Sequence, residues 1–429
     1  MKQKSPKYSI IIPARNGGKY LPSCIDTIIS QEYADYEIII SDDHSTDSSK
    51  EYLATLLTRP NIRVIEPPES LSMTEHWEWA LSHANGQWLI FVGQDDGLQP
   101  YFFELAEKLT AIAEAENIRT IMSERAYFFW PGCELVYGDI AVNYYARNKI
   151  KILNTQSEAL KALLGIQNYF ELPQMYTTSL FHKSILDEAR EKQDGKVLTC
   201  HPQDANLGVI ACSLDKHYLK SYIPLGWVGS SPKSAGMAIN FSHNSHDQIE
   251  EIKQLEQEYK TKIKNSELSY HELAGDFSFG DTSLYFWQAF LKTPALRKQS
   301  INKFLVSRSF KIIFFGALKS RLLLQNCSSK KIQEFNSILQ KNTCSRFAIF
   351  ITAVILLPIG KIFKVLNIFY RASMKINRVL LGRNVTIRLF RKEHTDLTIK
   401  QASSCVQAMI AKRKLFSCIV KTLQLRHLE

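Results

Sequence analysis

The first hundred residues alternate short, uniformly apolar runs with segments of helical spacing, and this alternation limits the chain to few folds. The apolar runs cover 8–13, 36–40, 62–65 and 87–92, and helical patterns lie between them at 21–29, 48–58 and 73–84. Strands that are apolar on both faces are typical of parallel sheets covered by helices on both sides. The sequence therefore predicts an α/β fold with a mostly parallel sheet flanked by helices.

Two pairs of aspartates follow the second and fourth apolar runs, at Asp42–Asp43 and Asp95–Asp96. Ligands of such sheets bind beyond the carboxyl ends of the strands, where both pairs would meet. Crowded carboxylates need a cation or hydrogen-bond donors to offset their charge, and oxygen ligands suit Mg²⁺ or Mn²⁺. These metals bridge diphosphates, so we expect a nucleotide-diphosphate site. A helix cap or solvated turn is the alternative for Asp42 and Asp47.

Three segments in order, 9–16, 37–47 and 84–100, resemble the inverting family 2 glycosyltransferases, which have the Rossmann-like GT-A fold. The resemblance covers the first 100 residues well and reaches to about residue 240 more weakly. It implies an enzyme that transfers a hexose or related sugar from a nucleotide-diphosphate donor. In this family the donor is usually a UDP-sugar. The acceptor would be a growing surface glycan, and a lipid-linked glycan is included among the expected acceptors.

The resemblance also assigns roles to single residues. It places the nucleotide-sugar site at Pro13, Ala14, Asn16, Asp43 and Asp95, with Asp43 on the base. Asp95 and Asp96 resemble the metal and ribose carboxylates, which implies Mn²⁺ or Mg²⁺ as cofactor. Many members have Asp where this chain has Gly93, which leaves the division of roles between Asp95 and Asp96 open.

An inverting transfer needs a base for the acceptor hydroxyl, and in the family an acidic residue about a hundred positions beyond the metal motif supplies it. Asp204 occupies that place, just before a helical pattern, and is the expected catalytic base. The alternative is that Asp204 only caps this helix. Glu171 and Asp187 are other acidic residues in the region, without a comparable setting.

Residues 224–236 are rich in Gly, Ser and Pro and predict a loop. On the acceptor side, Trp227 would stack on a sugar and Lys233 would meet a phosphate. The alternative is a plain connecting loop.

The net charge of +11 is unevenly distributed. Residues 1–300 hold 29 Lys and Arg against 38 Asp and Glu, whereas residues 301–429 hold 24 against 4. We therefore expect a catalytic domain over 1–240, a helical segment packing on it over 241–300, and a basic, mainly helical extension over 301–429.

The extension mixes cations with short apolar runs, the longest being the uncharged run at 347–360, which is too short to span a bilayer. This pattern favours a peripheral segment on an anionic membrane surface, and a small buried helical domain is the alternative. No nucleic-acid partner is expected, because the cations lie beside aliphatic runs without a binding motif. Scattered cysteines and the lack of a signal-peptide pattern favour the cytoplasm, on the inner face of the plasma membrane.

Two other functions stay open at this stage. A sugar-nucleotide pyrophosphorylase has a related fold but opens with a glycine-rich loop that the segment 13–16 lacks. A non-catalytic membrane-associated scaffold with a GT-A-like fold would explain Gly93 in place of an aspartate.

Overall fold

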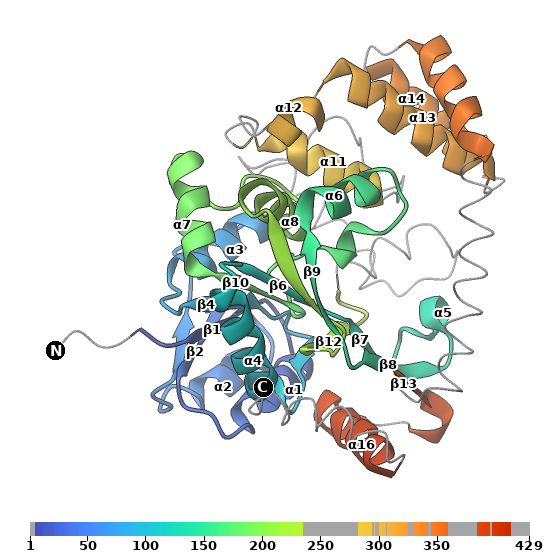
Figure 1. The fold of residues 1–429 in the computed structure, drawn as a ribbon. Coiled ribbons are helices and arrows are strands. Elements are labelled where there is room, and N and C mark those ends of the chain that lie inside the picture. The colour runs from blue at the N-terminus through green and yellow to red at the C-terminus, as the bar shows by residue number, and fades with distance from the viewer. Residues whose placement is uncertain are drawn as a thin grey trace.

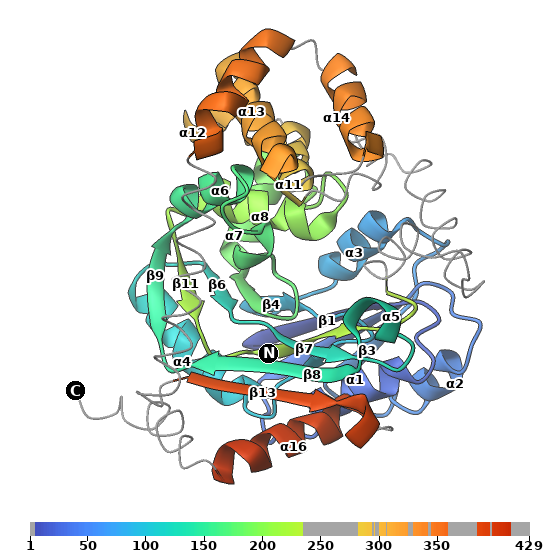
Figure 2. The same ribbon diagram turned by 90° about the vertical axis from the view of Figure 1, so that its right-hand side faces the viewer.

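A computed structural model describes residues 5–234, 282–293, 296, 300–305, 307–324, 329–341, 345–358, 384–394 and 397–412. Within these residues the strands form an eight-stranded sheet and a five-stranded sheet, with helices packed around both (Figures 1 and 2). The α/β class expected from the sequence is confirmed. Most of the helical segment expected over 241–300 and residues 359–383 of the basic extension lie outside the described residues.

The larger sheet begins with four parallel strands and continues with strands of mixed direction. Its spatial order is β3 (Ile62–Ile65), β2 (Tyr36–Asp42), β1 (Tyr8–Ala14), β4 (Trp88–Phe91), β10 (Ser179–His182), β6 (Thr120–Ser123), β11 (His217–Ser221) and β9 (Ile150–Asn154). β10 is antiparallel to both neighbours, and β9 is antiparallel to β11. The four apolar runs near the N-terminus thus lie side by side, as predicted.

Alternate side chains of the central strands enter different cores, which explains why these strands are apolar throughout. Ile10 and Ile12 belong to the core that includes α1 (Tyr20–Ile29) and α4 (Phe102–Ala115). Ile11 belongs to the core with α3 (Met73–Ser82), α7 (Lys183–Lys192) and α8 (Gln203–Leu214). Because successive side chains of a strand point to opposite faces, an apolar residue is needed at every position. The short helix α2 (Ser49–Ala54) precedes β3.

The smaller sheet has the order β13 (Asn384–Phe390), β8 (Ile140–Arg147), β7 (Ala126–Phe129), β12 (Gly226–Ser230) and β5 (Gly97–Leu98). It links the segment after Asp96 to the chain more than a hundred residues later, because β5 pairs with β12. The helix α5 (Glu134–Tyr137) joins β7 to β8. Residues 226–230 therefore form a strand, which corrects the prediction of a loop over 224–236.

A layer of helices covers α6 (Thr155–Leu163) and α8 at one end of the molecule (Figures 1 and 2). It comprises α11 (Thr282–Lys292), α12 (Ser300–Leu305), α13 (Arg308–Leu324) and α14 (Ser329–Lys341), and residues 346–358 are also helical. Apolar side chains of α11 and α13 share a core with α6 and α8. This layer is the helical part expected after residue 240.

The chain then returns to the opposite end of the molecule (Figure 2). There β13 forms the edge of the smaller sheet, and α16 (Ile399–Lys412) packs on α1. Ile399, Val406 and Ile410 are buried in the same core as β1. The C-terminal region is mainly helical, as expected, but residues 384–412 complete the sheet fold instead of forming a separate attachment.

Candidate active site

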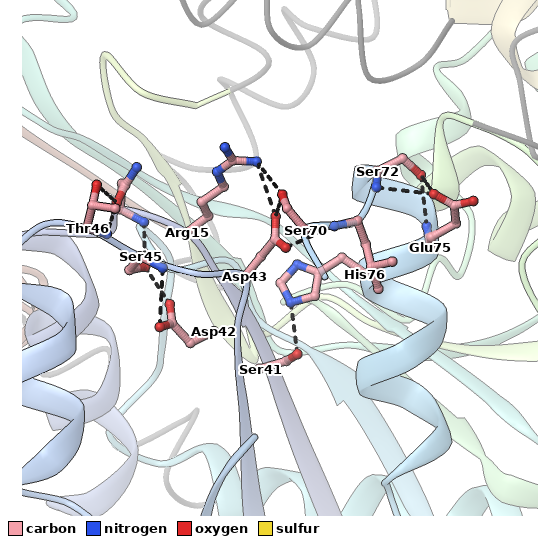
Figure 3. Close-up of polar contacts among 12 residues, drawn as sticks. Arg15, Ser41, Asp42, Asp43, Ser45, Thr46, Ser70, Ser72, Glu75 and His76 are labelled. Atoms are coloured by element: carbon pink, nitrogen blue, oxygen red, sulfur yellow. Dashed lines mark hydrogen bonds and ion pairs between the residues drawn. The ribbon is translucent and has the colours of Figure 1, made fainter. Parts of the chain in front are cut away.

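The loops that follow β1 and β2 are joined through Asn16 and Ser45. The backbone N–H of Asn16 donates to Oγ of Ser45 (2.8 Å), and Oδ1 of Asn16 accepts from the backbone N–H of Thr46 (2.8 Å). Asn16 has a φ of +50°, a conformation that asparagine tolerates better than most residues. Asp42 accepts from Ser45 within its own turn (Figure 3). Asp42 is 3% exposed and does not cap a helix, so it holds its own turn from a buried position.

Asp43 is 2% exposed and its two carboxylate oxygens are held by donors from two other loops (Figure 3). Nη1 of Arg15 lies 3.2 Å from Oδ2, which also accepts from Ser70 (3.2 Å). The backbone N–H of Leu71 donates to Oδ1 (3.0 Å). These contacts fix the carboxylate at the end of β2. Contact between Asp43 and a nucleotide base stays a prediction.

His76 lies beside this carboxylate on α3. The helix begins with a reciprocal cap, in which Ser72 accepts from the backbone N–H of Glu75 and the Glu75 side chain accepts from the backbone N–H of Ser72. Nε2 of His76 is 2.8 Å from Oγ of Ser41 in β2. Burial lowers the pKa of His76 to about 4, although the charge of Asp43 opposes the shift. The imidazole is therefore neutral at neutral pH.

The loop after β1 is also joined to the segment that carries the second pair of aspartates. The backbone N–H of Arg15 donates to Oε1 of Gln94 (2.9 Å), and Nε2 of Gln94 donates to the carbonyl of Arg15 (3.1 Å). The ends of β1, β2 and β4 thus form one connected edge, as the sequence predicts. The backbone of Pro13 and Ala14 pairs with β2, and the carbonyl of Ala14 accepts from the backbone N–H of Asp43 (2.8 Å).

Asp96 is fully buried and surrounded by donors. Oδ1 accepts from the backbone N–H of Gly229 (2.6 Å), and Oδ2 accepts from the backbone N–H of Gly93 (3.0 Å) and from the hydroxyl of Thr177. The hydroxyl of Tyr176 also lies beside this carboxylate, next to Gly93. Burial raises the pKa of Asp96 despite these donors. Asp96 therefore connects β4, β12 and the segment before β10.

Asp95 is 8% exposed and less completely occupied. Its Oδ2 accepts from the backbone N–H (3.1 Å) and the hydroxyl (2.7 Å) of Ser231, while Oδ1 accepts from no other residue that the structure describes. Burial and the nearby charge of Asp96 raise the pKa of Asp95. A Cβ at Gly229 would lie 1.8 Å from the carbonyl oxygen of Asp95, so only glycine allows β12 to approach this closely.

The residues at this edge fit a divalent metal that is held mainly by its substrate. Mg²⁺ and Mn²⁺ sites of phosphate-transfer chemistry use one or two carboxylates, with phosphate oxygens and water as the other ligands. Asp95 offers an open carboxylate oxygen, whereas both oxygens of Asp96 already have donors. Within the described ranges no group of three or more His, Cys, Asp or Glu side chains is arranged around a common point.

Asp204 is the second residue of α8 and is partly buried. The hydroxyl of Tyr169, in the short 3₁₀ helix Tyr169–Glu171, lies 3.2 Å from Oδ2, and Oδ1 accepts from the backbone N–H of Ala205 (2.7 Å). The N-cap of α8 is Pro202, so Asp204 does not cap the helix, although its negative charge suits the first turn. Burial raises the pKa of Asp204, while the nearby charge of Arg125 lowers it.

Tyr176 links the two parts of the site. Burial raises the pKa of Tyr176, and the charges of Asp96, Asp95 and Asp204 raise it further. The charges of the expected metal carboxylates and of the expected base therefore act on the same phenol. Glu171 instead pairs with Lys220 (2.8 Å), and Asp187 pairs with Arg190 on α7 (3.2 Å).

Trp227 and Lys233 have different environments. Trp227 is fully buried in β12, and its indole N–H donates to Oγ of Ser403 in α16 (2.7 Å). This burial corrects the expectation that Trp227 stacks on an acceptor sugar. Lys233 is exposed, and its Nζ lies 3.4 Å from the carbonyl of Asn16. It thus lies beside the loop after β1, on the side of the expected nucleotide.

Sequence reasoning did not identify Tyr176, Thr177, Gly229 and Ser231 as parts of the site. They lie between 80 and 136 residues beyond the nearby aspartate, Asp96 for the first three and Asp95 for Ser231. No local pattern marks a residue that acts only through such a distant contact. The sequence contained one indirect signal for this altered environment: Gly93 stands where many members of the family that the chain resembles have an aspartate.

The comparisons with known proteins agree on the N-terminal region. A family model described as glycosyl transferase family 2 matches residues 9–150. Glycosyltransferase GlyG of Streptococcus pneumoniae serotype 4 is 34% identical over 89 residues, which is 20% of this chain and 30% of that protein. A PGL/p-HBAD biosynthesis glycosyltransferase of Mycobacterium bovis is 33% identical over 97 residues, 22% of this chain and 37% of that protein. The chain thus spans about a third of the length of these curated relatives.

Among solved structures, residues 1–349 of S. aureus TarS in complex with UDP align with 78% of this chain and 91% of that chain at 13% identity. The TM-score is 0.41. The family model falls on the strands and loops that build the aspartate edge. Residues 9–150 of the chain thus match the glycosyl transferase family 2 model.

Proposed function

We propose that the protein is an inverting glycosyltransferase that moves a sugar from a nucleotide-diphosphate donor, a UDP-sugar, to a surface glycan or its lipid-linked precursor. One observation carries the proposal: the buried carboxylates Asp43, Asp95 and Asp96 lie at the connected ends of β2 and β4, within the segment that matches the family 2 model. This arrangement supports a donor site at this edge, and Asp204 is an acidic residue whose charge acts on Tyr176 together with those of Asp95 and Asp96.

Within this proposal Asp95 and Asp96 have different roles. Asp95, with its open oxygen, would hold Mn²⁺ or Mg²⁺, and Asp96 would keep the surrounding loops in place. The bound metal supplies positive charge to the leaving diphosphate. Asp43, Asn16 and the exposed Lys233 border the side of the site where the nucleotide and its phosphates would lie.

Asp204 would accept the proton of the acceptor hydroxyl as that oxygen attacks the anomeric carbon from the face opposite the diphosphate. Its raised pKa supports this role, because a more basic carboxylate accepts a proton more readily. The hydroxyl of Tyr169 orients the carboxylate.

A screen of nucleotide sugars for metal-dependent hydrolysis and transfer tests the proposed reaction. We expect one UDP-sugar to be turned over with Mn²⁺ or Mg²⁺ and D95A to lose that activity. Unchanged turnover in D95A would contradict the proposed donor site. If neither the wild type nor the variant binds a nucleotide, the scaffold function is favoured, and release of pyrophosphate from a sugar phosphate and UTP would indicate a pyrophosphorylase.

We also propose that the protein is peripheral on an anionic membrane through the helix 346–358. Phe347, Phe350, Ile351, Val354 and Ile355 recur at spacings of three and four on this helix, and all are exposed, Phe347 by 74%. Residues 301–358 contain nine Lys and Arg and one acidic residue. Exposed apolar side chains flanked by cations suit the interface of an anionic bilayer.

No helix of the described residues combines the length and the apolar character needed to cross a bilayer.

Vesicle flotation tests this membrane contact. The wild type should float with phosphatidylglycerol vesicles more than with phosphatidylcholine vesicles, and F347E/V354E should lose most of this binding. L57E is the matched control, because Leu57 is also an exposed aliphatic residue, 65% exposed, but lies outside this helix. Equal flotation of F347E/V354E and the wild type would contradict the contact.

A further inference from the structure

Gly93 and Tyr176 approach each other at the Asp96 carboxylate. A Cβ added at Gly93 would lie 2.5 Å from the hydroxyl oxygen of Tyr176 and 2.9 Å from Oδ2 of Asp96. Contacts this short do not occur at ordinary Cβ atoms, so the phenol occupies the space that a side chain at position 93 would need. The hydroxyl of Tyr176 and Oδ2 of Asp96 thus border the same small space beside Gly93.

The phenol is held in place from several directions. Its ring stacks on Trp77, with ring centroids 5.5 Å apart and planes at 26°. The residues on either side, Met175 and Thr177, have φ values of +50° and +31°, which are costly for residues other than glycine. Backbone hydrogen bonds join both of them to Phe91 in β4 (2.9 and 2.6 Å). Tyr176 therefore cannot move away from Gly93 without disrupting the end of β4.

Resting on the proposed function, we propose that Tyr176 is a positioning residue for the donor site and that Gly93 and Tyr176 form a matched pair. The phenol takes the place of a side chain at position 93 and holds Asp96. Asp96 in turn fixes the backbone N–H of Gly229, and two residues later Ser231 contacts Asp95. Tyr176 thus acts on the nucleotide and metal through Asp96 and the segment that follows it.

Four proteins test this pairing: the wild type, G93A, Y176F and G93A/Y176F, all as the full chain. The melting temperature measures how much the steric clash destabilises the fold. Calorimetric titration with UDP and Mn²⁺ measures the affinity of the donor site. In the wild type, G93A should lower the melting temperature and weaken UDP binding by at least about tenfold. In the Y176F background, where the hydroxyl is missing, G93A should weaken binding by less than about threefold.

Y176F alone should weaken binding by about tenfold, because it removes the hydroxyl that lies beside the Asp96 carboxylate. Y33F is the matched control, since it removes the phenol hydrogen bond to Glu107, which lies on α4 and not among the site residues, and should leave UDP binding unchanged.

Two results would overturn the inference. An equal drop of melting temperature from G93A in both backgrounds would refute the steric pairing, and wild-type UDP affinity in Y176F would refute the positioning role. If the wild type itself binds no UDP with Mn²⁺, the proposed function and the positioning role fail together, while the melting temperatures still decide whether Gly93 and Tyr176 are a matched pair.

Discussion

The acidic edge of the sheet and the basic helical layer depart from an ordinary protein surface in opposite ways. At the edge, Asp43, Asp95 and Asp96 are carboxylates that are buried. In the helical layer, Phe347 and Ile355 are large apolar side chains that are exposed. Buried charges need a compensating partner, and exposed apolar surface commonly marks a contact with another body. This difference supports the proposed ligand site in the first region and the proposed surface contact in the second.

The basic part of the sequence is divided between these two regions. Residues 384–412 pack on the sheets that carry the acidic edge. β13 pairs with β8, and Oγ of Ser403 accepts a hydrogen bond from the indole N–H of Trp227. Among the residues that the structure describes, the exposed apolar face of the basic region lies on the helix 346–358. The boundary in charge near residue 300 is thus not the boundary of the folded units.

The largest expected effect is on the rate of sugar transfer alone, without a change in membrane binding. D204N should lower the rate of sugar transfer by about 10²–10⁴-fold, the usual contribution of a general base, with unchanged affinity for UDP and for vesicles. Turnover of a labelled donor measures the rate. D187N is the control, since Asp187 only pairs with Arg190 on the surface of α7. Full activity of D204N would move the base elsewhere.

The transfer rate should also depend on pH through Asp204. A base works when deprotonated, and burial raises the pKa of Asp204, so activity should fall as the pH decreases through a value above the ordinary range of aspartate. Turnover measured across the acidic range reports this. The residual activity of D204N should lack the transition, and an identical transition in that variant would assign it to another group.

The next prediction tests whether the C-terminal strand and helix belong to the catalytic fold. W227A should lower the free energy of unfolding by about 3–5 kcal/mol, because it leaves a large cavity between β12 and α16. S403A removes only the hydrogen bond to the indole and should cost about 1–2 kcal/mol. Urea denaturation measures both. A loss below about 1 kcal/mol in W227A would contradict the packing of α16 on this core.

The smallest expected effect concerns His76. Its pKa of about 4 in the folded protein lies below the unfolded value of 6.5, so the unfolded state binds protons first as the pH decreases. His76 should therefore destabilise the fold progressively between about pH 6.5 and 4, by at most about 3 kcal/mol. Urea denaturation of wild type and H76Q compares the slopes. If the free energy of unfolding of H76Q depends on pH as steeply as that of the wild type, burial of a neutral imidazole is contradicted.

The sequence predicted the parallel strands and the aspartate edge well, because runs such as 8–13 have only one plausible environment. It did not predict that Asp96 is closed by donors while Asp95 keeps an open oxygen, because those donors come from distant segments. β13 was missed although its buried residues Val385, Ile387 and Leu389 alternate with less buried ones, a strand pattern. The burial of Trp227 depends on α16, which no local pattern links to it.

Calorimetric titration of UDP in the presence of Mn²⁺ tests the central claim, that the acidic edge is a metal-dependent nucleotide site, most directly. The wild type should bind UDP with Mn²⁺ and lose most of that affinity when EDTA is added, while D95N, folded with a near-normal melting temperature, should bind at least about tenfold more weakly. Equal UDP affinity in the wild type with and without metal, or in D95N, would contradict the account.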